Sequence, residues 1–131
     1  MTIIDTDKTP LVRLDYSDDE AWARVCELAT AANPEGFSAE LQMMEDPEIA
    51  GQDPQQVAPL FLEEFALLVF ADKASMTGEH TLLCVNPETP EESFRCVPAE
   101  LWAPENNLRL HNMGFAEFSS AVDHEGVFRG F

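Results

Sequence analysis

Residues 11–32 read LVRLDYSDDEAWARVCELATAA and combine a strand pattern with a helix pattern. In the first part, Val12, Leu14 and Tyr16 occupy alternate positions, which places them on one face of an extended chain. We therefore predict a strand over residues 11–16. Residues 1–10 are polar and end in Thr9-Pro10, so we expect a flexible lead-in before that strand.

The second part of this stretch predicts a helix from Asp18 to Ala32. Its apolar residues recur at helical spacing, and Asn33-Pro34 follows as a stop signal. Ser17 to Glu20 form a capping-box pattern, in which the Ser17 hydroxyl would accept from the Glu20 N–H. A strand followed directly by a helix points to a sheet with a helix packed on it.

The same criteria predict further elements on the C-terminal side of this helix. Asp53-Pro54 predicts the cap and first residue of a short helix that Pro59 ends, and Asn112 is expected to cap a second helix containing Phe115 and Phe118. The expected strands cover residues 37–43, 65–71, 81–85, 94–97 and 108–110, the last as an edge strand.

The order of these elements predicts an α/β (α+β) fold in a single domain spanning residues 11–131. We expect a mixed sheet of about five to six strands, with an N-terminal and a C-terminal helix packed on it. A doubly wound parallel sheet is less favoured, because the middle strands lack helical crossovers between them.

Charge excludes several classes of partner. The 131 residues contain 25 Asp and Glu against 7 Lys and Arg, a formal net charge of −18. Nucleic acids and anionic membranes would be repelled, and no apolar run reaches the roughly 20 residues of a membrane span. The first ten residues lack a signal-peptide pattern, and three widely spaced cysteines suit a reducing compartment, so we expect a cytoplasmic protein.

No motif for catalysis, for metal binding or for phosphate binding stands out. Six glycines form no phosphate-binding pattern, and neither C-x-x-C nor H-E-x-x-H occurs, so we expect no metal and no cofactor. Two weaker groupings remain. Asp72 follows an apolar strand, where functional carboxylates often lie, although a turn-initiating Asp explains it as well. A polar ligand pocket would combine the residues Asp72, His80, Arg95, Trp102, Asn107 and Asn112.

The C-terminal residues 127–131, VFRGF, are apolar for a chain end. They either dock into a partner or pack Phe128 and Phe131 against the protein's own core. We favour the second interpretation, because a free apolar tail is an aggregation liability.

Several stretches together resemble a family of small acidic actinobacterial proteins of unknown function. They are Trp102, residues 105–108 (ENNL), Asn112-Met113 with Phe115 and Phe118, and residues 126–131 (GVFRGF). The resemblance implies a bacterial, soluble, single-domain protein and brings no activity with it. The helix near Phe115 after a strand-rich middle is also similar, at the level of fold only, to SMI1/KNR4-type immunity proteins.

Two functions of different classes remain open. The first is a non-enzymatic acidic protein-binding domain, such as an immunity or inhibitor protein, whose charge would steer a basic partner. Its expected contact carboxylates lie in two loops: Glu45, Asp46, Glu48 and Asp53, then Glu88, Glu91 and Glu92. The second is a small-ligand or enzymatic domain with a pocket near Asp72, Arg95, Trp102 and Asn107.

Overall fold

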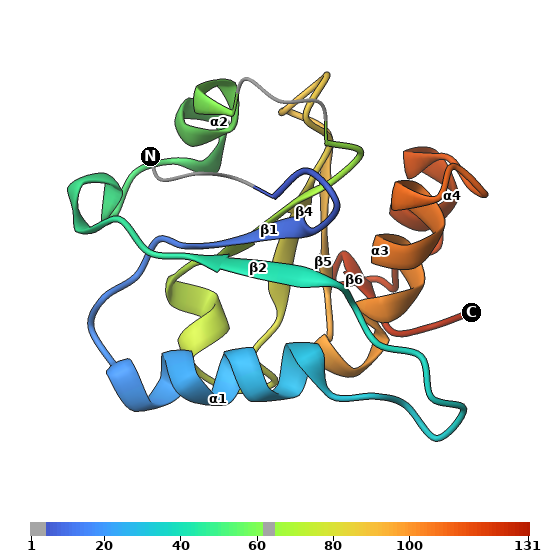
Figure 1. Ribbon diagram of the computed structural model, residues 1–131, viewed down its shortest axis with the longest axis horizontal. Helices are drawn as coiled ribbons and strands as arrows, with labels where there is room; N and C mark the ends of the chain where they lie inside the picture. The colour runs from blue at the N-terminus through green and yellow to red at the C-terminus, as the bar shows by residue number, and fades with distance from the viewer. Residues whose placement is uncertain (1–4, 62–64) are drawn as a thin grey trace.

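A six-stranded mixed sheet forms the centre of the computed structural model, which describes residues 5–61 and 65–131 (Figure 1). The strand order is β2-β1-β3-β4-β5-β6. β1 pairs parallel with β2 and β3, β3 to β5 run antiparallel, and β6 pairs parallel with β5. The strands are β1 (Thr9–Arg13), β2 (Leu41–Met44), β3 (Leu68–Ala71), β4 (Leu82–Val85), β5 (Ser93–Cys96) and β6 (Val127–Phe128). The predicted α/β class and mixed sheet are confirmed.

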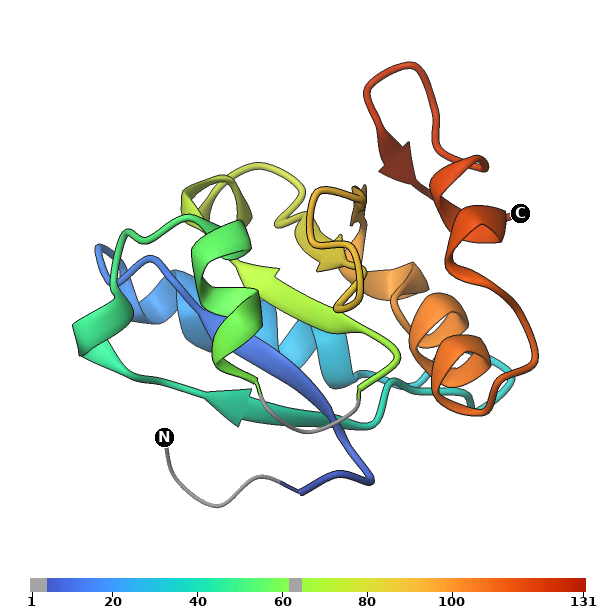
Figure 2. The ribbon, with the colours of Figure 1, turned by 90° about the horizontal axis from the view of Figure 1, so that it is seen from above.

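Helices cover both faces of this sheet. α1 lies along one face, α2 lies on the other, and α3 and α4 pack at the end where β5 and β6 lie (Figures 1 and 2). The helices are α1 (Asp19–Thr30), α2 (Pro54–Val57), α3 (Trp102–Arg109) and α4 (Phe115–Ser119). Short 3-10 turns are η1 (Pro47–Ile49), η2 (Ala58–Leu60), η3 (Lys73–Met76) and η4 (Pro98–Glu100).

The core is divided into two layers by the alternating side chains of β1 and β3. Leu11 and Val69 point to the α1 side and pack with Val25 of that helix. Val12 and Phe70 point to the α2 side, in the cluster that contains Val57. Both strands are therefore buried on both faces, which explains why residues 65–71 carry no polar alternation.

The connections between β1, β2 and β3 make half of the sheet doubly wound. The chain leaves β1 through α1 on one face, and it leaves β2 through η1 and α2 on the other before returning to β3 beside β1. The short helix predicted at Asp53-Pro54 lies in the crossover from β2 to β3. The middle strands β3 to β5 lack helical crossovers, as predicted, and run antiparallel.

Several element boundaries differ from the predictions. The strand predicted over residues 37–43 is observed only at Leu41–Met44. β1 begins at Thr9, so the buried Thr9 and Pro10 belong to the sheet and not to the lead-in; residues 1–4 of that lead-in lie outside the described residues. The edge strand predicted at residues 108–110 is wrong, because Leu108 and Arg109 end the helix α3. The alternation of Leu108 and Leu110 is two residues of a helix and its C-cap.

The helix caps are also partly corrected. Asp18, and not Ser17, caps α1 by accepting from the Ala21 N–H at 3.0 Å. Asp53 caps α2 as predicted. The cap predicted at Asn112 is wrong, because Gly114 precedes α4 and the Glu117 carboxylate accepts its backbone N–H at 2.7 Å.

The C-terminal segment packs on the protein's own core. β6 pairs with β5, and Phe128 is fully buried against Phe118 at a ring distance of 5.4 Å. Phe131 is 80% exposed, although its ring still contacts Phe118 and Phe128. The intramolecular interpretation is thus confirmed for Phe128. Within the described residues, no helix combines the length and apolar character needed to cross a membrane.

Candidate functional site

Arg13 is buried at the carboxyl end of β1, on the side of the sheet that α1 covers. Its side chain is only 3% exposed, although its guanidinium carries a full charge. It donates to Asp19 at 2.7 Å, to Glu45 at 2.9 Å and to the Asp15 carbonyl at 2.8 Å. One buried cation thereby joins the end of β1, the first turn of α1 and the segment that follows β2.

Two aromatic rings enclose the same guanidinium. Its central carbon lies 4.3 Å from the Tyr16 ring centre and 5.4 Å from that of Trp22, which is cation–π geometry. Burial lowers the pKa of Arg13, but the hydrogen bonds and charges of Asp19 and Glu45 raise it more, so it stays protonated. The Tyr16 hydroxyl accepts from the Asp46 N–H at 2.7 Å, and burial raises the pKa of that hydroxyl. These contacts fix the loop after β2.

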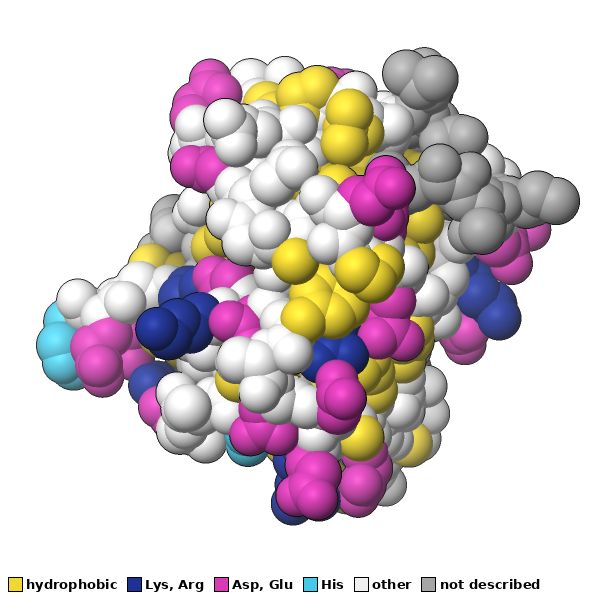
Figure 3. All heavy atoms as spheres, turned by 90° about the vertical axis from the view of Figure 1, so that its left-hand side faces the viewer, with side chains coloured by type: hydrophobic (Ala, Val, Ile, Leu, Met, Phe, Trp, Pro, Cys, Tyr) yellow, Lys and Arg dark blue, Asp and Glu magenta, His cyan; other side chains and the backbone are white. Residues whose placement is uncertain are grey.

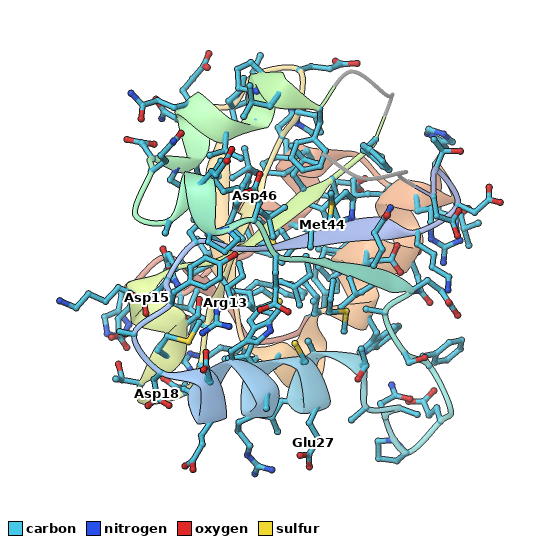
Figure 4. The ribbon with its side chains drawn as sticks, turned by 60° about the vertical axis from the view of Figure 1, so that its left-hand side comes forward. Arg13, Asp15, Asp18, Glu27, Met44 and Asp46 are labelled. Carbon is cyan, nitrogen blue, oxygen red and sulfur yellow. The ribbon has the colours of Figure 1, made fainter. Side chains whose placement is uncertain are left out.

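Carboxylates gather around Arg13, at the carboxyl ends of β1 and β2. Figure 4 shows Arg13, Asp15, Asp18 and Asp46 at the end of the molecule where β1 and β2 end. We call this the carboxyl-edge acidic surface and define it by Asp15, Asp18, Asp19, Glu45, Asp46 and Glu48. The cations near it are Arg13, which is buried, and the exposed Lys73, whose charge lowers the pKa of Asp15 after the hydrogen bonds of Ser17. The surface therefore stays strongly negative.

A hollow of about 510 Å³ opens in this surface. Its walls are formed by Val12, Met43, Met44, Pro47 and Ile49, with Glu45 and Asp46 beside them. The space-filling view of this side shows hydrophobic side chains in the middle of the face, with acidic side chains and a few basic ones around them (Figure 3). An apolar centre with a charged rim is the usual anatomy of a protein-binding patch.

The second predicted acidic loop lies at the opposite end of the strands, where β1, β2 and β3 begin. Glu88, Glu91 and Glu92 occupy the turn between β4 and β5, and they are exposed. β4 runs antiparallel to β3, so this turn lies at the amino ends of the parallel strands. Six of the seven predicted contact carboxylates thus lie at two separate places, three at each end of the strands. The seventh, Asp53, joins neither group and caps α2.

The turn between β4 and β5 borders a cleft of different chemistry. This cleft has a volume of about 710 Å³, and Lys8, Arg109 and His111 line it together with Glu88 and apolar residues. Lys8 is an exposed cation of this cleft, whereas Arg109 is paired with the buried Glu105. The cleft therefore carries less negative charge than the carboxyl-edge acidic surface.

Of the predicted pocket residues, Asp72, Arg95 and His80 come together. Arg95 donates to both carboxylate oxygens of Asp72 at 2.9 Å and to the Thr81 carbonyl at 2.7 Å. Ser75 Oγ and the Asp72 backbone and side chain complete a capping box, and His80 Nδ1 lies 2.9 Å from the Ser75 carbonyl. Burial raises the pKa of Asp72, but Arg95 and Ser75 lower it further than burial raises it. The group is a satisfied network that holds the turn after β3.

The other predicted pocket residues do not join this network. Trp102 stacks on Phe37 at 5.1 Å, Asn107 donates to the Ala103 carbonyl within α3, and Asn112 is exposed after α3. None of these residues, nor Asp72 or Arg95, lines either hollow described above. The predicted pocket residues Asp72, Arg95, Trp102, Asn107 and Asn112 do not share one pocket.

Sequence reasoning gave no role to Glu105, a carboxylate with no exposed surface. It accepts from Thr9 Oγ1 at 2.8 Å, from the Glu40 N–H at 2.6 Å and from Arg109 Nε at 2.8 Å. It thereby ties α3 to the amino ends of β1 and β2. The signal in the sequence was Arg109 four residues later on the same helix face, which the predicted strand concealed.

Cys84 and Cys96 lie beside each other in the core, and the neighbouring thiol together with burial raises the pKa of Cys96. All three cysteines are free, Cys84 and Cys96 are buried, and burial raises the pKa of Cys26 to about 11. Among residues 5–61 and 65–131, no three or more His, Cys, Asp or Glu side chains gather as a metal site would require. The carboxyl-edge acidic surface and its hollow are thus the main candidate site.

Comparison with known proteins assigns the chain to a family. Residues 8–131 match the model of the domain of unknown function DUF6924, and the chain belongs to this family. The match covers the sheet and all four helices. A search of the curated proteins finds no match to the chain.

Proposed function

We propose that this chain is a non-enzymatic acidic protein-binding domain, in the manner of an immunity or inhibitor protein, and that its partner is a basic protein. The carboxyl-edge acidic surface is the proposed contact. The observation that carries the proposal is the apolar hollow at this surface, with Glu45 and Asp46 on its walls and further carboxylates around its mouth.

The distribution of charge supports a basic partner. Each of the five arginines forms an ion pair with a carboxylate of the same chain, so none contributes a free positive patch. The excess of acidic groups is therefore left to face the solvent. Such a field accelerates encounter with a cationic partner and orients it.

The fixed positions of its carboxylates also support the carboxyl-edge acidic surface as the contact. Asp18 caps α1 and Asp46 caps η1, while Arg13 holds Asp19 and Glu45 in place. Carboxylates fixed by such contacts lose little conformational entropy when a Lys or Arg binds them. The cleft at the opposite end of the strands is lined by the cation Lys8 beside Glu88, so it attracts a basic partner less strongly.

The cellular setting proposed here is the cytoplasm of an actinobacterium. The resemblance of the C-terminal residues 126–131 to small acidic actinobacterial proteins supports it, and so do three unpaired thiols. The alternative function, a ligand or enzymatic pocket near Asp72, Arg95, Trp102 and Asn107, has less support. Only the first two of these residues meet, and they satisfy each other.

The test is affinity capture with two variants of equal charge change. Asp18→Asn/Asp46→Asn/Glu48→Gln removes three charges from the carboxyl edge, and its asparagines can still cap their helices. The control Glu88→Gln/Glu91→Gln/Glu92→Gln removes three charges from the opposite edge. Captured proteins are identified by mass spectrometry at low ionic strength.

We expect the parent chain and the control to capture the same basic protein, which salt releases, and the carboxyl-edge variant to lose it. Recovery of no basic protein would overturn the proposal, and so would an equal loss by both variants. Equal loss would mean that total charge matters and the surface does not.

A further inference from the structure

We infer that the outer edge of β2 takes up an extended, Lys- or Arg-containing segment of the partner as an additional strand of the sheet. The inference rests on the proposed function and specifies its binding mode. Three observations carry it: the position of β2 in the sheet, the composition of this strand and the surroundings of its free edge.

β2 is the terminal strand of the sheet and pairs on one side with β1. Thr9 donates its N–H to the Glu40 carbonyl, and in a parallel ladder every second residue faces the same neighbour. The backbone groups of Gln42 and Met44 consequently point to β1, and those of Leu41 and Met43 point outward. No backbone of the described residues hydrogen-bonds these outward groups.

The composition of β2 leaves this edge open. Natural edge strands are protected by Lys, Pro, bulges or very short length. The strand Leu41–Met44 reads LQMM and contains neither Lys nor Pro, and Met43 is 39% exposed. The other edge of the sheet, β6, has only two residues and offers little to a partner.

The residues around the outer edge of β2 favour a basic segment as the added strand. Met43 and Met44 form one wall of the 510 Å³ hollow, which suits an apolar side chain of an added strand. Glu40 is exposed at the start of β2, and Glu45 and Glu48 follow its end, so carboxylates flank the edge on both sides. A second copy of this chain is the disfavoured occupant, because two molecules of charge −18 repel each other.

In strand addition, the backbone and the side chains of the added strand contribute to binding in different ways. Main-chain hydrogen bonds provide affinity, and alternate side chains provide specificity. Here the outward N–H and C=O groups would pair with the added strand, the hollow would take an apolar residue, and the flanking carboxylates would take the basic ones. Flexible methionine side chains adapt to different apolar groups.

The experiment uses the full chain and two short synthetic peptides in which Lys and Val alternate. One has an ordinary backbone, and the other carries N-methyl groups on alternate amides, which leaves its charge unchanged and removes its strand-forming N–H donors. Binding is measured by fluorescence anisotropy, and the protection of the Leu41 and Met43 amides is measured by hydrogen exchange.

We expect the ordinary peptide to bind at least about tenfold more tightly than the methylated one, a difference of about 1.4 kcal/mol, and to protect the Leu41 and Met43 amides. Met43→Pro removes one outward N–H and should abolish that preference, because proline is tolerated where an edge N–H faces solvent. Met43→Val keeps the N–H and serves as the control.

Equal binding of both peptides, without protection at Leu41 and Met43, would overturn strand addition. If such binding is also lost in Asp18→Asn/Asp46→Asn/Glu48→Gln, the acidic surface still binds basic chains, and the proposed function survives. Protection of these amides in the free protein through self-association, detected by ultracentrifugation, would show a second copy on the edge and would also overturn the inference.

Discussion

At the scale of single residues, Arg13 shows how the acidic surface is built. A cation that is 3% exposed requires partners, and it obtains them from Asp19, Glu45, Tyr16 and Trp22. The charge on Arg13 thus organises the negative surface above it instead of merely reducing the total charge. The partners Asp19 and Glu45 remain 89% and 50% exposed, so solvent screens each pair.

Replacing Arg13 by Met should destabilise the fold by about 1 to 2 kcal/mol. Methionine keeps the aliphatic packing, but the ion pairs are lost, and their exposed carboxylates are rehydrated at little cost. Urea unfolding measures the effect. The control Arg24→Met removes an exposed pair with Glu27 and should stay within about 0.5 kcal/mol of the parent. Equal stability of the Arg13 and Arg24 variants would contradict this account.

Replacing Glu105 should lower the free energy of unfolding more than replacing Arg13 does. Both of its oxygens accept hydrogen bonds with no exposed surface, so Glu105→Gln turns one acceptor into a donor that faces other donors. A loss of about 3 kcal/mol in unfolding free energy is expected. Glu117→Gln is the matched control, because glutamine can still accept the Gly114 N–H. A Glu105→Gln protein as stable as that control would contradict the assigned role.

At the scale of elements, the C-terminal strand depends on one arginine. Arg129 donates to Asp123 at 2.7 Å and also pairs with Glu79 and Glu125. Asp123 in turn accepts the Val127 N–H, which sets the turn before β6. The hydrogen bond from Arg129, followed by that from Val127, lowers the pKa of Asp123 from 3.8 to about 2.

This shift predicts how β6 responds to acid. A carboxylate whose pKa is lowered by folding stabilises the folded form above its ordinary pKa and loses that effect as the pH falls. The amide of Val127 should therefore exchange slowly above about pH 4 and lose protection as the pH approaches about 2. Hydrogen exchange measures it. Arg129→Gln should weaken this protection at neutral pH while Arg24→Gln leaves it intact, and protection unchanged in both would refute the role of Arg129.

The elements also show what the sequence could predict. The predictions were correct where neighbouring residues decide the structure. The spacing of its apolar residues predicted α1, and Asp53-Pro54 predicted the start of α2. The predictions failed at α3, because the deciding contacts of Glu105 reach Thr9 and Glu40, far away along the chain. No periodicity within residues 102–110 encodes those contacts.

Local sequence patterns predicted only part of the candidate site, because its other residues are brought together by contacts between distant parts of the chain. Glu45, Asp46 and Glu48 were predicted as contact residues from charge alone, and the structure places them together in the segment that follows β2. That Asp15, Asp18 and Asp19 join them required the parallel pairing of β1 with β2, which sequence patterns did not specify. The separation of Glu88, Glu91 and Glu92 follows from the antiparallel β4, which also needed the strand order.

At the scale of the whole molecule, the net charge of −18 acts against the compact state as well as favouring a partner. Raising NaCl screens the repulsion, since the Debye length falls to about 8 Å at about 0.15 M. The Tm should therefore rise by about 2 to 5 °C between low salt and this concentration. Differential scanning calorimetry measures it. A Tm that falls with added NaCl would mean that the internal ion pairs outweigh the repulsion.

The central claim is that the carboxyl edge of the sheet, and not total charge, binds a basic partner. The most direct measurement is the Kd of the captured partner for the parent chain, for Asp18→Asn/Asp46→Asn/Glu48→Gln and for Glu88→Gln/Glu91→Gln/Glu92→Gln at one fixed ionic strength. We predict that the carboxyl-edge variant binds at least about tenfold more weakly than the parent, while the opposite-edge variant stays within about twofold. Equal weakening of both variants would contradict the claim.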